Sequence, residues 1–506
     1  MTGGGDRVVW GAGLFALGRF ADRVGLTEAL SAAVPARGER APVHDRGAVL
    51  VHALLVLAGG GEACTDIEYL RAQRELFGEV ASDSTLYRTL TGLGPGGAAA
   101  LMGAAAAVRP QLWADRDRGR PLILDVDSTL VEIHSENKEG AAPHFKGGYG
   151  FHPMICSVAD GEPLWVKLRP GNAAANDIAD HLEVIDAAVG TLPEPDAAGH
   201  RDGDDKSLAD RRLVVRIDAA GCSATLAAKL RDRNIGFAVS ARSNRGIAAA
   251  IRGALGDPDR WHNVPKRARR HLRRGSQVAD LTDLVDLTGW PEGTRLTVRR
   301  EPLHPGAQRS LFPSDNFRYW GFLTDQTGDA AHLDKLMRSH ADVENAVCRL
   351  NHSGLARMPF TDWHANSAWA ALAMTGLALV GWFQTCCLTA ALRRAAPKRL
   401  RWQLWHLPAL VCHTARRVLL RLPQQHPGAK ALLAIAHPRW PPRRPPQRSA
   451  RTPRAGPAAS APTPRSIPRP NRGQKLPRRT RVRTPTTPKR QNRPTLTPKR
   501  RLAAFS

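Results

Sequence analysis

The feature that most constrains the fold is a series of short apolar segments between residues 122 and 240. Segments rich in Val, Ile and Leu predict buried strands, and apolar positions at helical spacing between them predict amphipathic helices. Three predicted strands come first, followed by a helix, a strand, a second helix and a fifth strand. Their sequences are LILDVDSTLVEI, GFHPMICSVAD, EPLWVKLRPG, the helix DIADHLEVIDAAVGTL, LVVRIDAAG, the helix SATLAAKLRDRN and GFAVSARS.

This order predicts an α/β fold in which helices flank an RNase H-like mixed sheet. Two of the predicted strands carry an aspartate where their apolar run ends, Asp127 and Asp218, and Glu344 follows inside the helical stretch HLDKLMRSHADVENAVCRL. Side chains at strand ends are free to converge, and carboxylate oxygens are the ligands that Mg²⁺ and Mn²⁺ prefer. Two such ions on a phosphodiester activate the attacking oxygen and stabilise the leaving one. We therefore expect Asp127, Asp218 and Glu344 to be catalytic metal ligands for phosphoryl transfer on nucleic acid.

The charge is distributed in a way that agrees with a nucleic-acid partner. Of the 73 lysines and arginines, 29 follow Asp362, after which the sequence has no acidic residue. Before that point 44 basic residues face 46 acidic ones, so the whole net charge of +27 comes from the C-terminal part. A long basic segment is typical of proteins that bind a polyanion, because contacts to phosphates release counterions. A solvated tail without a partner is the competing interpretation.

The sequence predicts five regions. Residues 1–115 form a helical N-terminal region for DNA binding or support, and 116–244 form the first part of the catalytic core. Residues 245–317 form an insertion domain between the second and third carboxylates, in which Lys266, Arg267, Arg269 and Arg270 are expected to contact DNA phosphates. Residues 318–440 complete the core and add C-terminal helices. Residues 441–506 hold 15 prolines and 19 basic residues, which predicts a disordered tail.

One segment raises the question of a membrane. Residues 368–392 carry no charge and are long enough to span a bilayer. Ala, Gly, Thr and Gln dilute the segment, so we predict a buried core helix and no membrane partner. The seven cysteines form no C-x-x-C pair, and the N-terminus lacks the apolar run of a secretory signal. We expect a cytoplasmic, nucleoid-associated protein.

Several ordered motifs resemble a known family. The block that begins LDVDSTLVEIHSENKEG, the segment VRIDAAG and the segment RSHADVENAVCRLNHSGLARMPF are similar to the three acidic motifs of bacterial insertion-sequence DDE transposases. The resemblance is specifically to the group named for insertion sequence thirteen-eighty, and it extends over roughly residues 10–440. It includes the N-terminal segment LVLAGGGEACTDIEYLRAQRELFGEVASDSTLYRTL.

The resemblance implies a function for individual residues. Asp127, Asp218 and Glu344 match the three catalytic acids, which would hold two Mg²⁺ or Mn²⁺ ions for strand cleavage and strand transfer. Arg338 and His340 fall at positions where the family places residues that face DNA, although a surface helix position is the simpler interpretation of both. The implied partners are double-stranded DNA, as element ends and target, and a second copy of the chain in a synaptic homodimer.

Two departures and one rival motif leave alternatives open. Asn351 stands where the family usually has a basic residue and Asp342 where it has an arginine, so a DNA-binding remnant without activity is one alternative. The tail is also consistent with a frameshifted or read-through end. LILDVDSTL fits, in addition, the D-x-D-x-T motif of haloacid-dehalogenase-type phosphatases, with Asp125 as nucleophile and Asp127 as acid and base. That alternative leaves Asp218 and Glu344 without a role.

Overall fold

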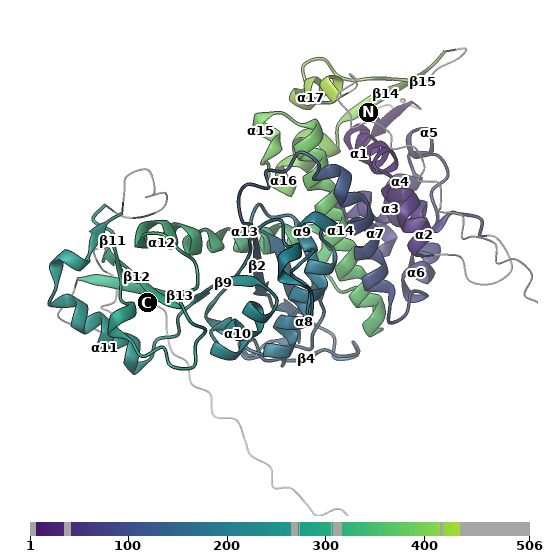
Figure 1. Ribbon diagram of the computed structural model, residues 1–506. Coiled ribbons are helices and arrows are strands. Elements are labelled where there is room, and N and C mark those ends of the chain that lie inside the picture. The colour runs from purple at the N-terminus through teal and green to yellow at the C-terminus, as the bar shows by residue number, and fades with distance from the viewer. Residues whose placement is uncertain are drawn as a thin grey trace, which may run out of the picture. The chain divides into compact units, whose positions relative to one another are not determined.

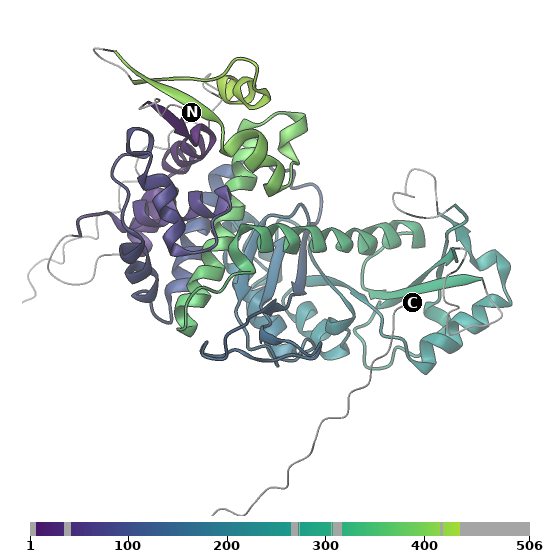
Figure 2. The same ribbon diagram turned by 180° about the vertical axis from the view of Figure 1, so that it is seen from behind.

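The computed structural model describes residues 7–34, 42–264, 272, 274–304, 306, 316–414 and 418–435 (Figures 1 and 2). Two predictions fall outside these residues. They are the tail at 441–506 and the phosphate contacts Lys266, Arg267, Arg269 and Arg270.

Helices dominate the first 112 residues, as the sequence predicts. Ser82 caps one of these helices, because its Oγ accepts a hydrogen bond from the Thr85 N–H at 3.3 Å. Leu17, Phe20 and Leu54 are fully buried in the core that these helices share with the C-terminal helices. The helices are α1 (Ala12–Arg23), α2 (Leu26–Ala33), α3 (Arg46–Gly59), α4 (Glu68–Arg71), α5 (Arg74–Phe77), α6 (Asp83–Thr91) and α7 (Gly97–Leu112).

The uncharged segment forms most of α14 (Trp363–Cys387). Figure 1 shows α14 passing between the N-terminal helices and the central sheet, and it contacts α3, α7 and β7. By length and composition this helix could cross a bilayer, but 78% of its most apolar stretch is buried inside the protein. It is therefore the core helix that the sequence predicts. The C-terminal elements that follow are α15 (Ala390–Arg393), α16 (Pro397–Leu400), β14 (Pro408–His413), β15 (Val418–Arg421) and α17 (Pro427–Ile435), with β1 (Val8–Trp10) pairing β14.

The central sheet has nine strands in the order β10-β11-β12-β13-β9-β8-β2-β6-β7. The predicted strands occupy one end of it. β2 pairs antiparallel with β6 and parallel with β8, and β8 pairs parallel with β9. This order confirms the RNase H-like mixed sheet. The strands are β2 (Leu122–Ser128), β6 (Met154–Val158), β7 (Pro163–Lys167), β8 (Leu213–Ile217) and β9 (Ile235–Ser240), with a small second sheet of β3 (Val131–Glu132), β4 (Ala142–Pro143) and β5 (Tyr149–Phe151).

The two faces of β2 carry different side chains because residues alternate along a strand. Leu122, Leu124 and Val126 point into an apolar core with the helices α8 (Ile178–Gly190) and α10 (Ala224–Asp232). Asp125 and Asp127 point to the opposite face. There they meet residues of the helical segment made of α12 (Ala330–Arg338), a short turn at Ser339–Ala341 and α13 (Asp342–Leu350). β2 thus directs apolar side chains to one face of the sheet and two acidic side chains to the other.

The segment predicted as an insertion domain extends the same sheet. Its elements are α11 (Arg245–Leu255), β10 (His262–Asn263), β11 (Gln277–Asp280) and β12 (Arg295–Pro302). The chain then returns to the core in β13 (Phe317–Thr324), which pairs antiparallel with both β12 and β9. The insertion therefore continues the central sheet beyond β9 instead of forming a sheet of its own.

Candidate active site

The three predicted acids lie at positions that the sheet brings together. Asp127 is the next-to-last residue of β2, and Asp218 directly follows β8. β2 and β8 are parallel, with Val126 opposite Ile217, so both carboxylates emerge at the same sheet edge. Glu344 lies in the first turn of α13, which contacts β2. The architecture therefore delivers all three side chains from separate elements to one region.

The negative charges of both other acids act on the Asp127 carboxylate. The pKa of Asp127 is raised to about 6, mainly because the side chain is buried and in smaller part because of the negative charges of Asp218 and Glu344. The Ser128 N–H, which donates to Asp127 Oδ1 at 2.7 Å, and the nearby His340 act in the opposite direction. In the described part of the chain no lysine or arginine forms an ion pair with any of the three acids. We call these three residues, Asp127, Asp218 and Glu344, the acidic cluster.

A second charged group lies beside the acidic cluster and is fully paired. Asp125 is 1% exposed and receives two hydrogen bonds from the Arg216 guanidinium, at 2.7 and 2.6 Å. His340 Nδ1 lies 2.7 Å from Asp125 Oδ1, and Arg216 also donates to the Leu336 carbonyl at 2.6 Å. These contacts tie β2 and β8 to α12 and to the turn before Glu344. We call Asp125, Arg216 and His340 the buried charge network.

The buried charge network changes how two predicted residues are interpreted. Asp125 cannot act as an open nucleophile, because its carboxylate is enclosed and both oxygens are bound by Arg216, so the phosphatase alternative loses its central residue. His340 is 7% exposed and directed inward to Asp125, which disagrees with the expectation that it faces DNA. Sequence reasoning missed Arg216. The available signal was a charged residue inside the apolar run LVVRI, since buried charges are nearly always paired.

Arg338, the other predicted DNA-facing residue, is also engaged within the protein. Its Nε lies 3.3 Å from Asp334 Oδ2, and its side chain is 15% exposed. Asp334 is buried and pairs in addition with Arg299 at 2.8 Å. The geometry therefore gives Arg338 a structural contact, and its role toward DNA remains a prediction.

A pocket of about 440 Å³ opens next to the acidic cluster. Residues 344, 347, 348 and 351 have the spacing of one helix face, and this face of α13 forms one side of the pocket. The opposite side comes from the end of β2. The lining residues are Asp127, Ser128, Thr129, Glu344, Val347, Cys348, Asn351 and His352. Glu344 is exposed, so a ligand in this pocket can reach both Glu344 and Asp127.

The acidic cluster fits a divalent metal by donor type and by charge. Hard cations take carboxylate oxygens, and the repulsion among three acids without a basic partner favours a bound cation. However, among the described residues no group of three or more His, Cys, Asp or Glu side chains is placed tightly enough to hold a metal. The two observations agree if the acids feel one another's charge at a distance longer than a shared coordination shell. The exposed side chains of Asp218 and Glu344 would have to rotate towards Asp127 before the three acids could bind one metal ion together.

A mixed sheet of this order, with acids at the ends of β2 and β8 and in a following helix, is typical of RNase H-like proteins. The chain belongs to the transposase DDE domain family, since the model for transposase DDE domain group 1 matches residues 1–438. This confirms the predicted resemblance to DDE transposases, and it does not discriminate among insertion-sequence groups.

Two further comparisons add little to the family match. Among solved structures, the chain is similar to a piggyBac transposase, described as a cryo-EM structure of a synaptic complex with hairpin DNA. The identity is 10% and the TM-score 0.34, over 78% of this chain and 79% of that one. This likeness is too distant to transfer a property to the present chain. No curated protein matches it.

Proposed function

We propose that the protein cleaves DNA at the inverted-repeat ends of an insertion sequence and transfers the cut strands into target DNA. Asp127, Asp218 and Glu344 would hold two divalent ions, Mg²⁺ or Mn²⁺. When bound, such ions activate an attacking oxygen and stabilise the charge on the leaving oxygen of a phosphodiester. The observation that carries the proposal is the acidic cluster: acids from three elements, two of which act electrostatically on Asp127, with no lysine or arginine paired to any of them among the described residues.

The remaining residues of the site have roles that follow from their contacts. The Ser128 N–H fixes one oxygen of Asp127, and the Ala220 N–H fixes one oxygen of Asp218 at 2.9 Å. The buried charge network holds β2, β8 and the turn before α13 in register, and so sets the spacing of the acidic cluster. Positioning of this kind matters because misplacement by about 1 Å can cost roughly 100-fold in rate.

We further propose double-stranded DNA as the partner, both as element ends and as target, with two copies of the chain acting together. Cutting both ends of one element and joining them to one target requires that the ends be held together, which a homodimer achieves by symmetry. The proposed location is the cytoplasm, in association with the nucleoid.

The test is metal-dependent nicking of a plasmid that carries the DNA flanking the coding region, including its terminal repeats. We expect nicks at the repeat ends with Mg²⁺ or Mn²⁺, none with EDTA, and none with Glu344→Gln. Asp342→Asn is a matched control, because Asp342 is an exposed acid in the same turn of α13. Specific binding of the ends without any nicking by the unaltered protein would instead identify a DNA-binding remnant.

A further inference from the structure

A second cavity lies along the same sheet edge as the acidic cluster. β2, β8 and β9 are parallel, so Asp127, Asp218 and the loop Ala241–Asn244 all emerge at their carboxyl ends. The loop after β9 is fastened to the loop that carries Asp218. Arg242 donates to the Ala219 carbonyl at 2.7 Å and to the Ala220 carbonyl at 2.9 Å. A cavity beside Ala241–Asn244 is therefore held in a fixed relation to Asp218.

The cavity forms where β9 and β13 separate. The two strands pair from Thr324, opposite Ala238, to Phe322, opposite Ser240. One further hydrogen bond follows, from the Ala241 N–H to the Gly321 carbonyl at 2.9 Å. The chain then turns away from β13 into α11, whose first turn is capped by Asn244 Oδ1. The space between α11 and β13 measures about 440 Å³. Its lining residues are Ala241, Ser243, Asn244, Arg245, Ile247, Ala248, Ile251, Arg318, Tyr319 and Gly321.

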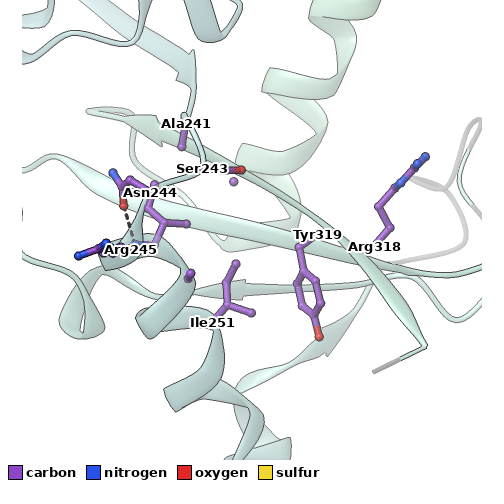
Figure 3. Close-up of a pocket in the computed structure, with 10 residues that line it drawn as sticks. Ala241, Ser243, Asn244, Arg245, Ile251, Arg318 and Tyr319 are labelled. Carbon is purple, nitrogen blue, oxygen red and sulfur yellow. Dashed lines mark hydrogen bonds between the residues drawn. The ribbon is translucent and has the colours of Figure 1, made fainter. Parts of the chain in front are cut away.

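The lining combines two cations with apolar surface. Figure 3 shows Arg245 and Arg318 at opposite ends of the cavity, with Ile251 and the Tyr319 ring between them. The Arg318 side chain extends from β13 in the direction opposite to the Tyr319 ring and lies over Trp320, 5.7 Å from its ring centre, so Arg318 stands at the rim of the cavity. Both arginines are exposed, and within the described ranges neither forms an ion pair with an acidic side chain. The lining itself contains no Asp or Glu. This chemistry suits a ligand that has anionic groups at intervals and less polar rings between them.

We infer that this cavity is a subsite for the DNA strand that extends away from the acidic cluster, an assignment that rests on the proposed function. Arg245 and Arg318 would bind backbone phosphates, and the sugar or base edge would lie over Ile251 and Tyr319. Phosphate contacts of this kind position a strand without reading its sequence, and aromatic rings offer sequence-tolerant stacking. The subsite also supplies positive charge that the acidic cluster lacks, which offsets the repulsion between DNA phosphates and three carboxylates.

The primary experiment compares duplex DNA binding by the full chain and by the double variant Arg245→Ala/Arg318→Ala. Fluorescence anisotropy in EDTA, with a duplex carrying one terminal repeat, keeps binding separate from cleavage. We expect affinity to fall about tenfold for each arginine, since hydrogen bonds to charged groups contribute on this scale. The slope of log K against log salt should become shallower by about 0.9 for each lost phosphate contact. Arg252→Ala is the matched control, because Arg252 is exposed on α11 outside the cavity and should leave both quantities unchanged.

Phosphate ethylation interference tests where the contact lies. Ethylation at one or two phosphates on one side of the cleavage position should weaken binding of the unaltered protein and have no effect on the double variant. Equal affinity and equal salt slope for both proteins would overturn the subsite. So would a rise in Tm with inorganic phosphate or dAMP that the double variant loses while its duplex affinity stays unchanged, since the cavity would then hold a small anion.

The outcomes distinguish this inference from the proposed function. Nicking by the unaltered protein, together with unchanged binding by the double variant, removes the subsite and leaves the transposition proposal intact. Absence of nicking with a clear binding defect in the double variant removes the catalytic proposal and supports the subsite. Circular dichroism and thermal unfolding identify a folding defect, which we do not expect because exposed arginines contribute little to stability.

Discussion

Two charged groups lie side by side on the same face of β2, and their charges are neutralised by partner residues to different extents. The buried charge network pairs Asp125 with Arg216 and His340, so each charge is satisfied within the protein. The acidic cluster begins only two residues further on, at Asp127, and its three acids form no ion pair with a lysine or arginine among the described residues. Paired buried charge is compatible with a structural role, whereas acids gathered without a counter-charge indicate a site for an external cation. The comparison therefore gives Asp125 a structural role and Asp127 a metal-binding role, although both lie in β2.

The largest expected effect comes from altering the acidic cluster. Asp127→Asn, Asp218→Asn and Glu344→Gln should each reduce nicking by at least ~10³-fold, because metal coordination contributes several kcal/mol of transition-state stabilisation. None of the three variants should be less stable than the unaltered protein, since each change removes repulsion. Nicking rates and Tm measured in parallel check both statements. Retained nicking in any of the three variants would contradict the assignment of that residue.

The next effect is on stability and comes from the buried charge network. Arg216→Met leaves Asp125 as a buried, unpaired charge apart from His340, and should lower the free energy of unfolding by about 3–5 kcal/mol. The double variant Arg216→Met/Asp125→Leu removes the stranded charge and should recover much of this loss. Urea unfolding of the two variants measures the difference. A single variant as stable as the unaltered protein would show that the network contributes nothing to folding.

The raised pKa of Asp127 predicts how the free energy of unfolding depends on pH. The pKa of Asp127 is about 6 in the folded protein, against about 3.9 for an unfolded aspartate. Between these values the folded state binds a proton that the unfolded state does not, so stability should fall as pH rises from about 4 to about 6. The fall amounts to at most about 3 kcal/mol. Unfolding free energies of the unaltered protein minus those of Asp127→Asn isolate this contribution.

Divalent cations should reverse that loss. Above pH 6, Mg²⁺ or Mn²⁺ neutralises the acidic cluster and should raise the Tm, whereas near pH 4.5 protonation of Asp127 removes most of the effect. Samples treated with EDTA, and therefore free of divalent cations, serve as the reference. An equal rise in Tm for Asp127→Asn would locate the ion elsewhere.

The difference between the two groups also explains what the sequence could predict. The strand order, the core helix α14 and the positions of Asp127, Asp218 and Glu344 follow from periodicity and from motifs, because each depends on local pattern. The pairing of Asp125 with Arg216 depends on the register of two strands separated by 91 positions, and no local pattern encodes it. The same holds for the insertion, where nothing in residues 245–317 indicates that β12 and β13 extend the central sheet.

The inward orientation of His340 and Arg338 has the same origin. Both lie in a helical segment where exposure could not be assigned from sequence, because their partners Asp125 and Asp334 become neighbours only after folding. A resemblance to a family supplies the position of such residues and not the direction of their side chains.

The smallest predicted effect tests the structural interpretation of Arg338. Arg338→Gln removes one of two arginines that bind Asp334, and Arg299 remains at 2.8 Å to keep that buried carboxylate paired. The free energy of unfolding should therefore fall by only ~1 kcal/mol, the scale of a single hydrogen bond. Duplex affinity and its salt slope should match those of Lys335→Gln, a control that removes one exposed charge from the same helix. If Arg338→Gln weakens DNA binding more than the control does, Arg338 must leave Asp334 to contact DNA. Arg338 would then be a DNA-binding residue and not a structural partner of Asp334.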